Sequence, residues 1–295
     1  MDQTTANKWK SEVLDVIFEA LAESNQLVDC LVFKGARVLN KRLDSFARQS
    51  LDIDANLLSG FVEENPDFTE QKKFLEEEIS RSITKHFEKQ SPVRFELTRI
   101  KIVLNPPRKH PLGWTAFTVT ISINDLANVS VRGLPSLKID LAAPEELGDE
   151  SISSLNIGGY KVKAYTIERI AGEKLRAFLS SLPSYRKKLK KPGEAVRAKD
   201  IYDIARIVSQ YPISDNQFWK KTGNEFRRAC KSRFIDCSGI ETFEEDLHVT
   251  KETYEKDAAL PKDISFERAW GSLTKIISLF EEKEAIPFEN PLPDK

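Results

Sequence analysis

The sequence predicts an α+β fold over residues 1–160, followed by a mainly helical part over residues 161–295. Two observations lead to this prediction. Between residues 94 and 143, three segments alternate apolar and polar residues, which is typical of strands. From Thr166 onward, apolar residues recur instead at spacings of three and four, which is typical of amphipathic helices. A chain of 295 residues is long enough for two such domains.

The first 90 residues combine helical and extended patterns. Residues 7–24 carry apolar side chains on one helix face: Trp9, Val13, Val16, Ile17 and Leu21. A short apolar run, LVDCLVFKG, leads through a glycine turn into a second predicted helix, ARVLNKRLDSFA. The stretch SLDIDANL, residues 50–57, alternates and is predicted to be a strand. Residues 69–89 form a charged amphipathic helix with Phe74, Ile79, Ile83 and Phe87 inside.

The middle of the chain predicts three strands, RFELTRIKIVL, TAFTVTISIN and SLKIDLAAP. The first two are separated by NPPRKHPLG, which is typical of a loop, and the third is ended by Pro144. Two amphipathic helices follow, TIERIAGEKLRAFLSSL, with Thr166 as N-cap, and RAKDIYDIARIV. The proline-rich tail, IPFENPLPDK, is expected to be loosely held.

Composition and motifs exclude several classes of protein. Lys and Arg total 45 against 46 for Asp and Glu, so the net charge of −1 does not indicate a partner. The three cysteines show no CxxC spacing, which argues against a disulfide framework or a zinc site. The N-terminus has no secretory signal pattern, and no apolar run approaches the ~20 residues of a transmembrane helix. We therefore expect a cytoplasmic protein without membrane contact. Walker A, GxSxG and GxGxxG motifs are absent.

Asp52 and Asp54 raise a specific question, because two like charges side by side repel each other. In a strand they project to one face, while Leu51 and Ile53 are buried on the other. The shared face is either a solvated strand edge or a cation site, since Mg²⁺ prefers carboxylate oxygens. Asp140 supplies a third carboxylate from another apolar strand. The sequence leaves open whether Asp140 meets the other two.

Gly35 and Lys174 each allow two interpretations. Gly35 stands between a strand and a helix, where a backbone can approach a ligand and the first N–H groups can bind an anion, but such glycines are also common in ordinary turns. Lys174 lies on the apolar face of its helix, four residues after Ile170 and four before Phe178. It pairs either with a bound triphosphate or with a buried carboxylate, or its amine extends to solvent.

In the next helix, Asp200 flanks the apolar stripe and is the better candidate for a site, whereas Asp203 orients a neighbour such as Arg206 or faces water. The segment YRKKLKK, residues 185–191, is strongly basic. It either contacts the phosphates of a nucleic acid or forms a solvated loop. The candidate contact residues are Arg186, Lys187, Lys188, Lys190 and Lys191.

Four stretches taken in order, VFKGARVLNKRL, RQSLDIDANL, YTIERIAGEKLRAFLS and RAKDIYDIARIV, resemble the AbiEii/AbiGii toxin family of nucleotidyltransferases. The resemblance covers roughly residues 28 to 210. It implies a polymerase-β-like nucleotidyltransferase fold with a mixed β-sheet. Members are toxin components of type IV toxin–antitoxin and abortive-infection modules.

The resemblance also implies roles for individual residues. Lys34, Gly35 and Ala36 match a glycine-rich motif that contacts nucleotide phosphates, although Ala36 replaces the usual Gly or Ser and offers no hydroxyl. A second motif, with two aspartate metal ligands, is matched by Arg48, Ser50, Asp52 and Asp54. Glu173 and Lys174 match the EKL motif, in which the lysine reaches the nucleotide. The last acidic motif is matched by Asp200 and Asp203.

The implied reaction is transfer of a nucleoside monophosphate from an NTP, with Mg²⁺ or Mn²⁺ held by Asp52 and Asp54. Asp140, which the strand pattern suggests, is the expected third ligand. Lys174 and Arg48 would stabilise the triphosphate, and Asp140 or Asp200 would accept a proton. The implied acceptor is RNA, in particular a tRNA acceptor stem, and the implied partner is a cognate antitoxin. Two alternatives remain: transfer to a small molecule or protein, and a non-catalytic nucleotide-binding interaction protein.

Overall fold

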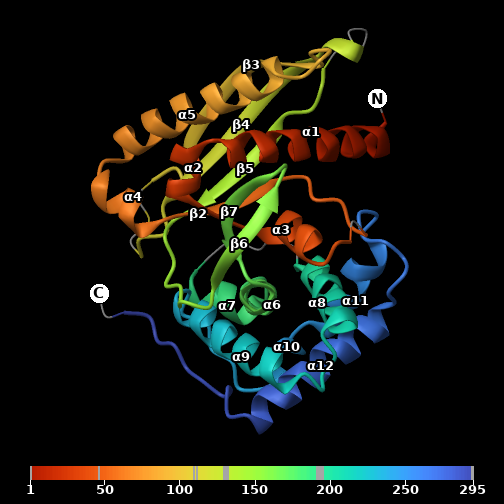
Figure 1. The fold of residues 1–295 in the computed structure, drawn as a ribbon. Helices are drawn as coiled ribbons and strands as arrows, with labels where there is room; N and C mark the ends of the chain where they lie inside the picture. Colours follow the sequence, from red (N-terminus) through yellow and green to blue (C-terminus); the bar gives the residue numbers. More distant parts are fainter. Residues whose placement is uncertain are drawn as a thin grey trace. The chain divides into compact units, whose positions relative to one another are not determined.

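The computed structural model describes residues 2–45, 47–108, 110, 112–128, 133–190 and 196–293. The chain folds into two compact units (Figure 1), each described by itself below. Unit 1 comprises Met1–Arg42, Gln49–Glu145 and Ile152–Tyr165, and unit 2 comprises Leu43–Arg48, Glu146–Ser151 and Thr166–Lys295. The sequence pattern placed a boundary near residue 160 but did not indicate that two short inner segments belong to unit 2.

Unit 1 is built on a seven-stranded mixed sheet in the order β3-β4-β5-β2-β1-β7-β6. Strand β2 runs parallel to β5, and β1 runs parallel to β7, whereas the other neighbours are antiparallel. The strands are β1 (Leu31–Lys34), β2 (Ile53–Leu57), β3 (Phe95–Asn105), β4 (Ala116–Asp125), β5 (Leu137–Ala142), β6 (Ile152–Ile157) and β7 (Tyr160–Tyr165).

Alternation along the strands separates a core face from an open face. In β4, for example, Phe117, Val119 and Ile121 are buried. Helix α5 (Phe68–Glu88) packs on β3 and on α1 (Gln3–Glu23). The three strands predicted in the middle of the chain are confirmed as β3, β4 and β5. The helices predicted over residues 7–24 and 69–89 are confirmed as α1 and α5. The remaining helical segments of the unit are short: α2 (Asn25–Cys30), α3 (Gly35–Arg42), α4 (Ser59–Glu64) and the 3₁₀ turn η1 (Leu126–Asn128).

Details of the SLDIDANL stretch differ from the prediction. Leu51 precedes β2 and is only half-buried. Asn56, which strand alternation places on the same face as Asp52 and Asp54, is fully buried. Its side-chain amide donates a hydrogen bond of 2.8 Å to the hydroxyl of Tyr165. A neighbouring buried hydroxyl therefore holds a polar residue inside the sheet. The β6–β7 hairpin that carries Tyr165 was not predicted as strands.

Unit 2 is helical. Its elements are α6 (Ile167–Leu179), α7 (Pro183–Lys188), α8 (Ala198–Gln210), α9 (Asn216–Lys231), α10 (Ile240–Phe243), α11 (Leu247–Lys256) and α12 (Phe266–Glu282). The predicted cap of α6 is confirmed, since the Thr166 hydroxyl accepts a hydrogen bond from the backbone N–H of Arg169. Gly172 allows α6 to approach α9 closely, because a Cβ there would lie 2.6 Å from the backbone nitrogen of Phe226.

Residues 286–290 of the proline-rich tail are held by defined hydrogen bonds, so the expectation that the tail is loosely held was wrong for this part. Cys237 and Phe288 exchange two backbone hydrogen bonds of 3.0 and 2.9 Å. Asn290 adds bonds to Asp236 and to the carbonyl of Ile235. In the part of the chain that the structure describes, no helix combines the length and apolar character needed to cross a bilayer.

Candidate metal centre

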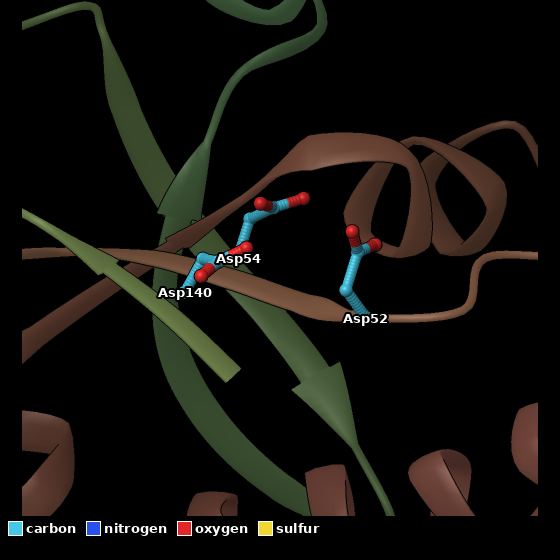
Figure 2. Close-up of side chains that lie close together, drawn as sticks. All are labelled: Asp52, Asp54 and Asp140. Carbon is cyan, nitrogen blue, oxygen red and sulfur yellow. The ribbon is translucent and has the colours of Figure 1, made fainter. Parts of the chain in front are cut away.

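Three aspartates of unit 1 come together over the central strands. One carboxylate oxygen from each of Asp52, Asp54 and Asp140 lies within 4.8 Å of the other two. Figure 2 shows the three side chains gathered beside one another. The parallel pairing of β2 with β5 places Asp54 directly opposite Asp140, and Asp52 lies two residues before Asp54. The sheet therefore brings the third carboxylate to the predicted pair.

Asp140 is held by two neighbours on the same face. The Thr118 hydroxyl donates to its Oδ1 at 2.9 Å, and the Lys138 amine donates to its Oδ2 at 2.6 Å. All three aspartates are half-buried, so an ion can reach them from solvent. Their oxygens are the donor type that hard divalent cations prefer. The donor set thus fits Mg²⁺ or Mn²⁺, which would offset the repulsion between the three carboxylates.

Gly35 packs against this carboxylate cluster. Its φ is +80°, and a Cβ added there would lie 2.1 Å from Oδ2 of Asp54. A side chain at position 35 would therefore both strain the backbone and collide with a candidate metal ligand. Ala36 follows inside α3 and is buried. Close backbone approach, which the sequence suggested for a ligand, is observed here toward a carboxylate.

Arg37 is a residue that the sequence interpretation missed. Its side chain is buried, and its guanidinium donates hydrogen bonds to the backbone carbonyls of Ser50 and Asp52 and forms an ion pair with Asp15. The Ser50 hydroxyl lies 3.3 Å from Oδ1 of Asp52. Arg37 and Ser50 therefore hold the segment that carries Asp52. The signal available in the sequence was that Arg37 stands between the apolar residues Ala36 and Val38.

Lys34 has partners of its own. Its amine lies 3.8 Å from a carboxylate oxygen of Glu145 and 5.7 Å from the centre of the Tyr165 ring. These contacts hold the Lys34 side chain at the end of β1.

Unit 2 contains a second cluster of charges, centred on Lys174. The Lys174 amine lies 2.8 Å from Oδ1 of Asp200 and 2.7 Å from Oδ2 of Asp203. Both carboxylates are fully buried. The predicted inward direction of Lys174 agrees with this position, and the alternative of a buried ion pair is realised in unit 2. Glu173 instead bonds to Arg169 and Arg176.

Three arginines complete this cluster. Arg48 donates to both oxygens of Asp203, Arg197 donates to Asp200 at 2.6 Å, and Arg206 lies 3.5 Å from Asp203. Of the two alternatives for Asp203, exposure to water is wrong, because its side chain is fully buried. The helical phase of α8 points it away from the main apolar stripe, but Arg48 comes from the short segment Leu43–Arg48 and covers it. The expected contact with Arg206 is observed.

The two carboxylates and the lysine shift one another's pKa. Burial favours the neutral forms, but the charges of Arg197 and Lys174 outweigh burial and lower the pKa of Asp200. Lys174 and Arg48 likewise outweigh burial and lower the pKa of Asp203 to about 2. Burial opposes the charge of Lys174, yet the two carboxylates raise its pKa. A low pKa makes Asp200 a weak proton acceptor.

The basic segment was expected to contact nucleic acid. Lys188 is engaged, since it forms an ion pair of 2.6 Å with Asp236 and donates to the carbonyl of Asn290. Lys187 and Lys190 are exposed, and Arg186 is half-buried. Lys191 lies outside the described residues. The segment therefore joins α7 to the tail through one of its cations.

Known proteins resemble this chain in sequence and in fold. The family described as "Nucleotidyl transferase AbiEii toxin, Type IV TA system" matches residues 18–279. No curated protein sequence matches.

Two proteins from Helicobacter pylori, one assigned as a nucleotidyltransferase and the other named JHP933, share the fold with a TM-score of 0.51 and 14% sequence identity each. Both matches cover 96% of this chain, with 97% and 94% of the respective relatives. They confirm the predicted α+β fold of nucleotidyltransferase type. MenT4, a nucleotidyltransferase toxin from Mycobacterium tuberculosis H37Rv, matches with a TM-score of 0.48 and 14% identity, over 95% of this chain and 88% of that chain.

Proposed function

Because this chain belongs to the AbiEii nucleotidyl transferase toxin family of type IV toxin–antitoxin systems, we propose that the aspartates of unit 1 catalyse nucleotidyl transfer from an NTP to an RNA acceptor. The observation that carries this proposal is the meeting of Asp52, Asp54 and Asp140 on one sheet face. Asp54 and Asp140 from two parallel strands, with Asp52 just before the first strand, form a donor set for a divalent cation. Family membership supplies the reaction class.

The residues that would hold Mg²⁺ or Mn²⁺ are Asp52, Asp54 and Asp140. When bound, the cation would neutralise charge on the triphosphate and on the departing pyrophosphate. Arg37 and Ser50 fix the backbone and carboxylate of Asp52, while Gly35 leaves room for the carboxylate of Asp54. These contacts support a donor set whose geometry is held before the nucleotide binds.

In the proposed reaction, an acceptor hydroxyl oxygen attacks the α-phosphorus of the NTP. A bond from that oxygen to phosphorus forms, the bond from the α-phosphorus to the bridging oxygen breaks, and pyrophosphate leaves. We assign the hydroxyl proton to Asp140. Thr118 and Lys138 orient this carboxylate. Asp200 is the weaker candidate, because its ion pairs lower its pKa.

For unit 2 we propose that Lys174 and Arg48 contribute to phosphate binding. Their cluster joins the lysine and three arginines to the carboxylates of Asp200 and Asp203. Burial and the neighbouring charge of Arg197 lower the pKa of Lys199 beside them, which is the effect expected where cations lie close together. Cations at this position suit an anionic ligand such as a phosphate.

The proposed acceptor is tRNA or another RNA, and the proposed partner is a cognate antitoxin, which the name of a type IV toxin–antitoxin family supports. Exposed Lys187 and Lys190 remain proposed RNA contacts. RNA as the acceptor implies that the toxin stops growth by acting on translation, and that co-expression of the antitoxin restores growth.

Transfer of a labelled nucleoside monophosphate onto total tRNA, compared with small acceptors, tests the proposed function. We expect wild type to label tRNA. The labelling rates of Asp52→Asn and Asp54→Asn should be lower by roughly 100-fold or more, because a bound metal supplies several kcal/mol of charge stabilisation. Asp29→Asn, which removes an exposed carboxylate of the same unit, serves as the matched control and should retain activity. Undiminished labelling by the Asp52 and Asp54 variants would exclude this site.

A further inference from the structure

The open face of the sheet continues outward from Asp140 across β4 and β3. Cα pairing places Asp140 opposite Thr118, and Thr118 opposite Val103. One row further along, Lys138, Thr120 and Lys101 are opposite one another in the same way. Since directly opposed residues in a sheet share a face, these side chains lie on the side of the metal ligands. We call the surface formed by Arg99, Lys101, Thr118, Thr120 and Ser122 the β3–β4 face.

Cations and hydroxyls dominate the β3–β4 face. Lys101 and Arg99 are exposed, and Arg99 is paired with Ser122 one row beyond Lys101. In the next row outward on this face, Glu96 lies opposite Asn124, whose side-chain amide donates a hydrogen bond of 3.0 Å to it. Neither cation has an ion-pair partner among the described residues. The alternate residues, such as Ile102 and Val119, are buried on the opposite side of the sheet. The two cations therefore project toward solvent on the same side as the carboxylate triad.

Distance also connects this face with the reaction. Adjacent strands lie ~4.8 Å apart and successive rows on one face lie ~7 Å apart, so the Cα of Lys101 is on the order of 12 Å from that of Asp140. A lysine at that separation reaches the backbone of a polymer whose end lies at Asp140. It does not reach the reacting atoms themselves.

We propose that the β3–β4 face binds the phosphate backbone of a single-stranded nucleic acid whose terminal hydroxyl lies at the triad. This inference rests on the proposed function. Cations spaced along a strand, with hydroxyl donors between them, suit the repeating phosphates of one strand. The only large apolar side chain exposed in these rows of the described sheet is Val103, at 41%. The face therefore lacks the apolar anchors that protein interfaces use.

The test uses the full-length protein and a fluorescently labelled single-stranded RNA of about 12 nucleotides, within the length that extended nucleic-acid grooves cover. Fluorescence anisotropy gives the Kd at several KCl concentrations. The variant Arg99→Gln with Lys101→Gln removes two cations from the β3–β4 face. The matched control, Lys72→Gln with Lys73→Gln, removes two exposed cations from α5.

We expect the Arg99/Lys101 variant to bind RNA more weakly and to lower the slope of log K against log [salt] by about 1.4, because each lost phosphate contact of a single strand contributes about 0.7. Affinity for the NTP alone should not change. The control should follow wild type. The charge-conserving variant Arg99→Lys with Lys101→Arg should restore the slope, which separates charge from folding.

Equal slopes for wild type and the Arg99/Lys101 variant would overturn the inference, as would the absence of RNA binding by wild type. The inference would also be overturned if the Arg99/Lys101 variant still bound RNA but its toxicity were no longer neutralised by a co-expressed antitoxin. That result would assign the β3–β4 face to a protein partner. The variant Asp54→Asn tests the proposed function separately. It should lose nucleotidyl transfer, while its RNA affinity and the slope of its salt dependence should equal those of wild type.

Discussion

Gly35 illustrates at the scale of one residue how the backbone and the carboxylates share space. The absence of a side chain lets α3 begin directly beside Asp54, and the positive φ of Gly35 turns the chain from β1 into the helix. Its neighbour Arg37 then bonds to the backbone of Ser50 and Asp52. A short segment of the chain thus sets the positions of two of the three candidate ligands.

Gly35→Ala should reduce nucleotidyl transfer strongly, because the new Cβ would displace the carboxylate of Asp54. It should also destabilise the protein by about 1–3 kcal/mol through backbone strain at positive φ. Gly159→Ala is the matched control. Its φ of +90° imposes similar strain, but a Cβ there meets nothing within 4 Å. Activity assays and denaturant titrations of both variants distinguish the two effects, and equal activities would contradict the role assigned to Gly35.

At the scale of secondary structure, two pairs of elements create the two charged clusters. Strands β2 and β5 pair in parallel and bring Asp54 opposite Asp140. Helices α6 and α8 bring Lys174 to Asp200 and Asp203. The aspartate cluster is open to solvent and is therefore suited to binding an ion. The Lys174 cluster is buried, and its ion pairs hold α6 against α8.

Acid should weaken the α6–α8 pairing. The folded pKa of Asp203, about 2, lies below the ordinary value of 3.8, so the stability that its ion pairs with Lys174 and Arg48 confer is present above about pH 4. That stability is lost as the pH falls toward 2. We expect the free energy of unfolding of wild type to decrease over this window.

Asp203→Asn cannot titrate, so its free energy of unfolding should be lower at pH 5 and depend less on pH between 4 and 2. The measurement is urea unfolding at a series of pH values. Asp246→Asn removes an exposed carboxylate of the same unit and should leave the wild-type slope unchanged. Identical slopes for wild type and Asp203→Asn would show that this ion-pair cluster does not set the acid response.

The whole molecule consists of two units, each with its own buried core. The candidate metal ligands all belong to unit 1, whereas the buried ion-pair cluster belongs to unit 2. A ligand that binds only the folded triad stabilises the unit that contains it by an amount set by its concentration relative to its Kd.

Mg²⁺ or Mn²⁺ at ten times its Kd should therefore raise the free energy of unfolding of unit 1 by about 1.4 kcal/mol. Thermal unfolding with and without the cation measures this gain. Asp54→Asn and Asp140→Asn should each lose most of the gain, while Asp29→Asn should keep it. A gain that persists in both ligand variants would place the cation elsewhere.

Local patterns were sufficient for much of the fold. Alternation predicted β3, β4 and β5, because each of these strands turns its buried side chains to one face. Helical spacing placed Lys174 inward on α6. The resemblance of four ordered stretches indicated the family that the sequence comparison confirms. The β6–β7 hairpin was missed although YKVKAY alternates exposed Lys161 and Lys163 with buried Val162 and Ala164. The weaker pattern of its partner, ISSLNI, hid the pairing.

Contacts between distant segments depended on the tertiary structure. The meeting of Asp140 with Asp54 depends on strand register, the burial of Asp203 depends on Arg48 from a remote segment, and the tail is held by its pairing with Cys237. Residue spacing indicates which way a side chain points from its own helix or strand. Which residue lies opposite it is decided only when elements far apart in the chain pack together, since that choice minimises the free energy of the whole core and belongs to no single segment.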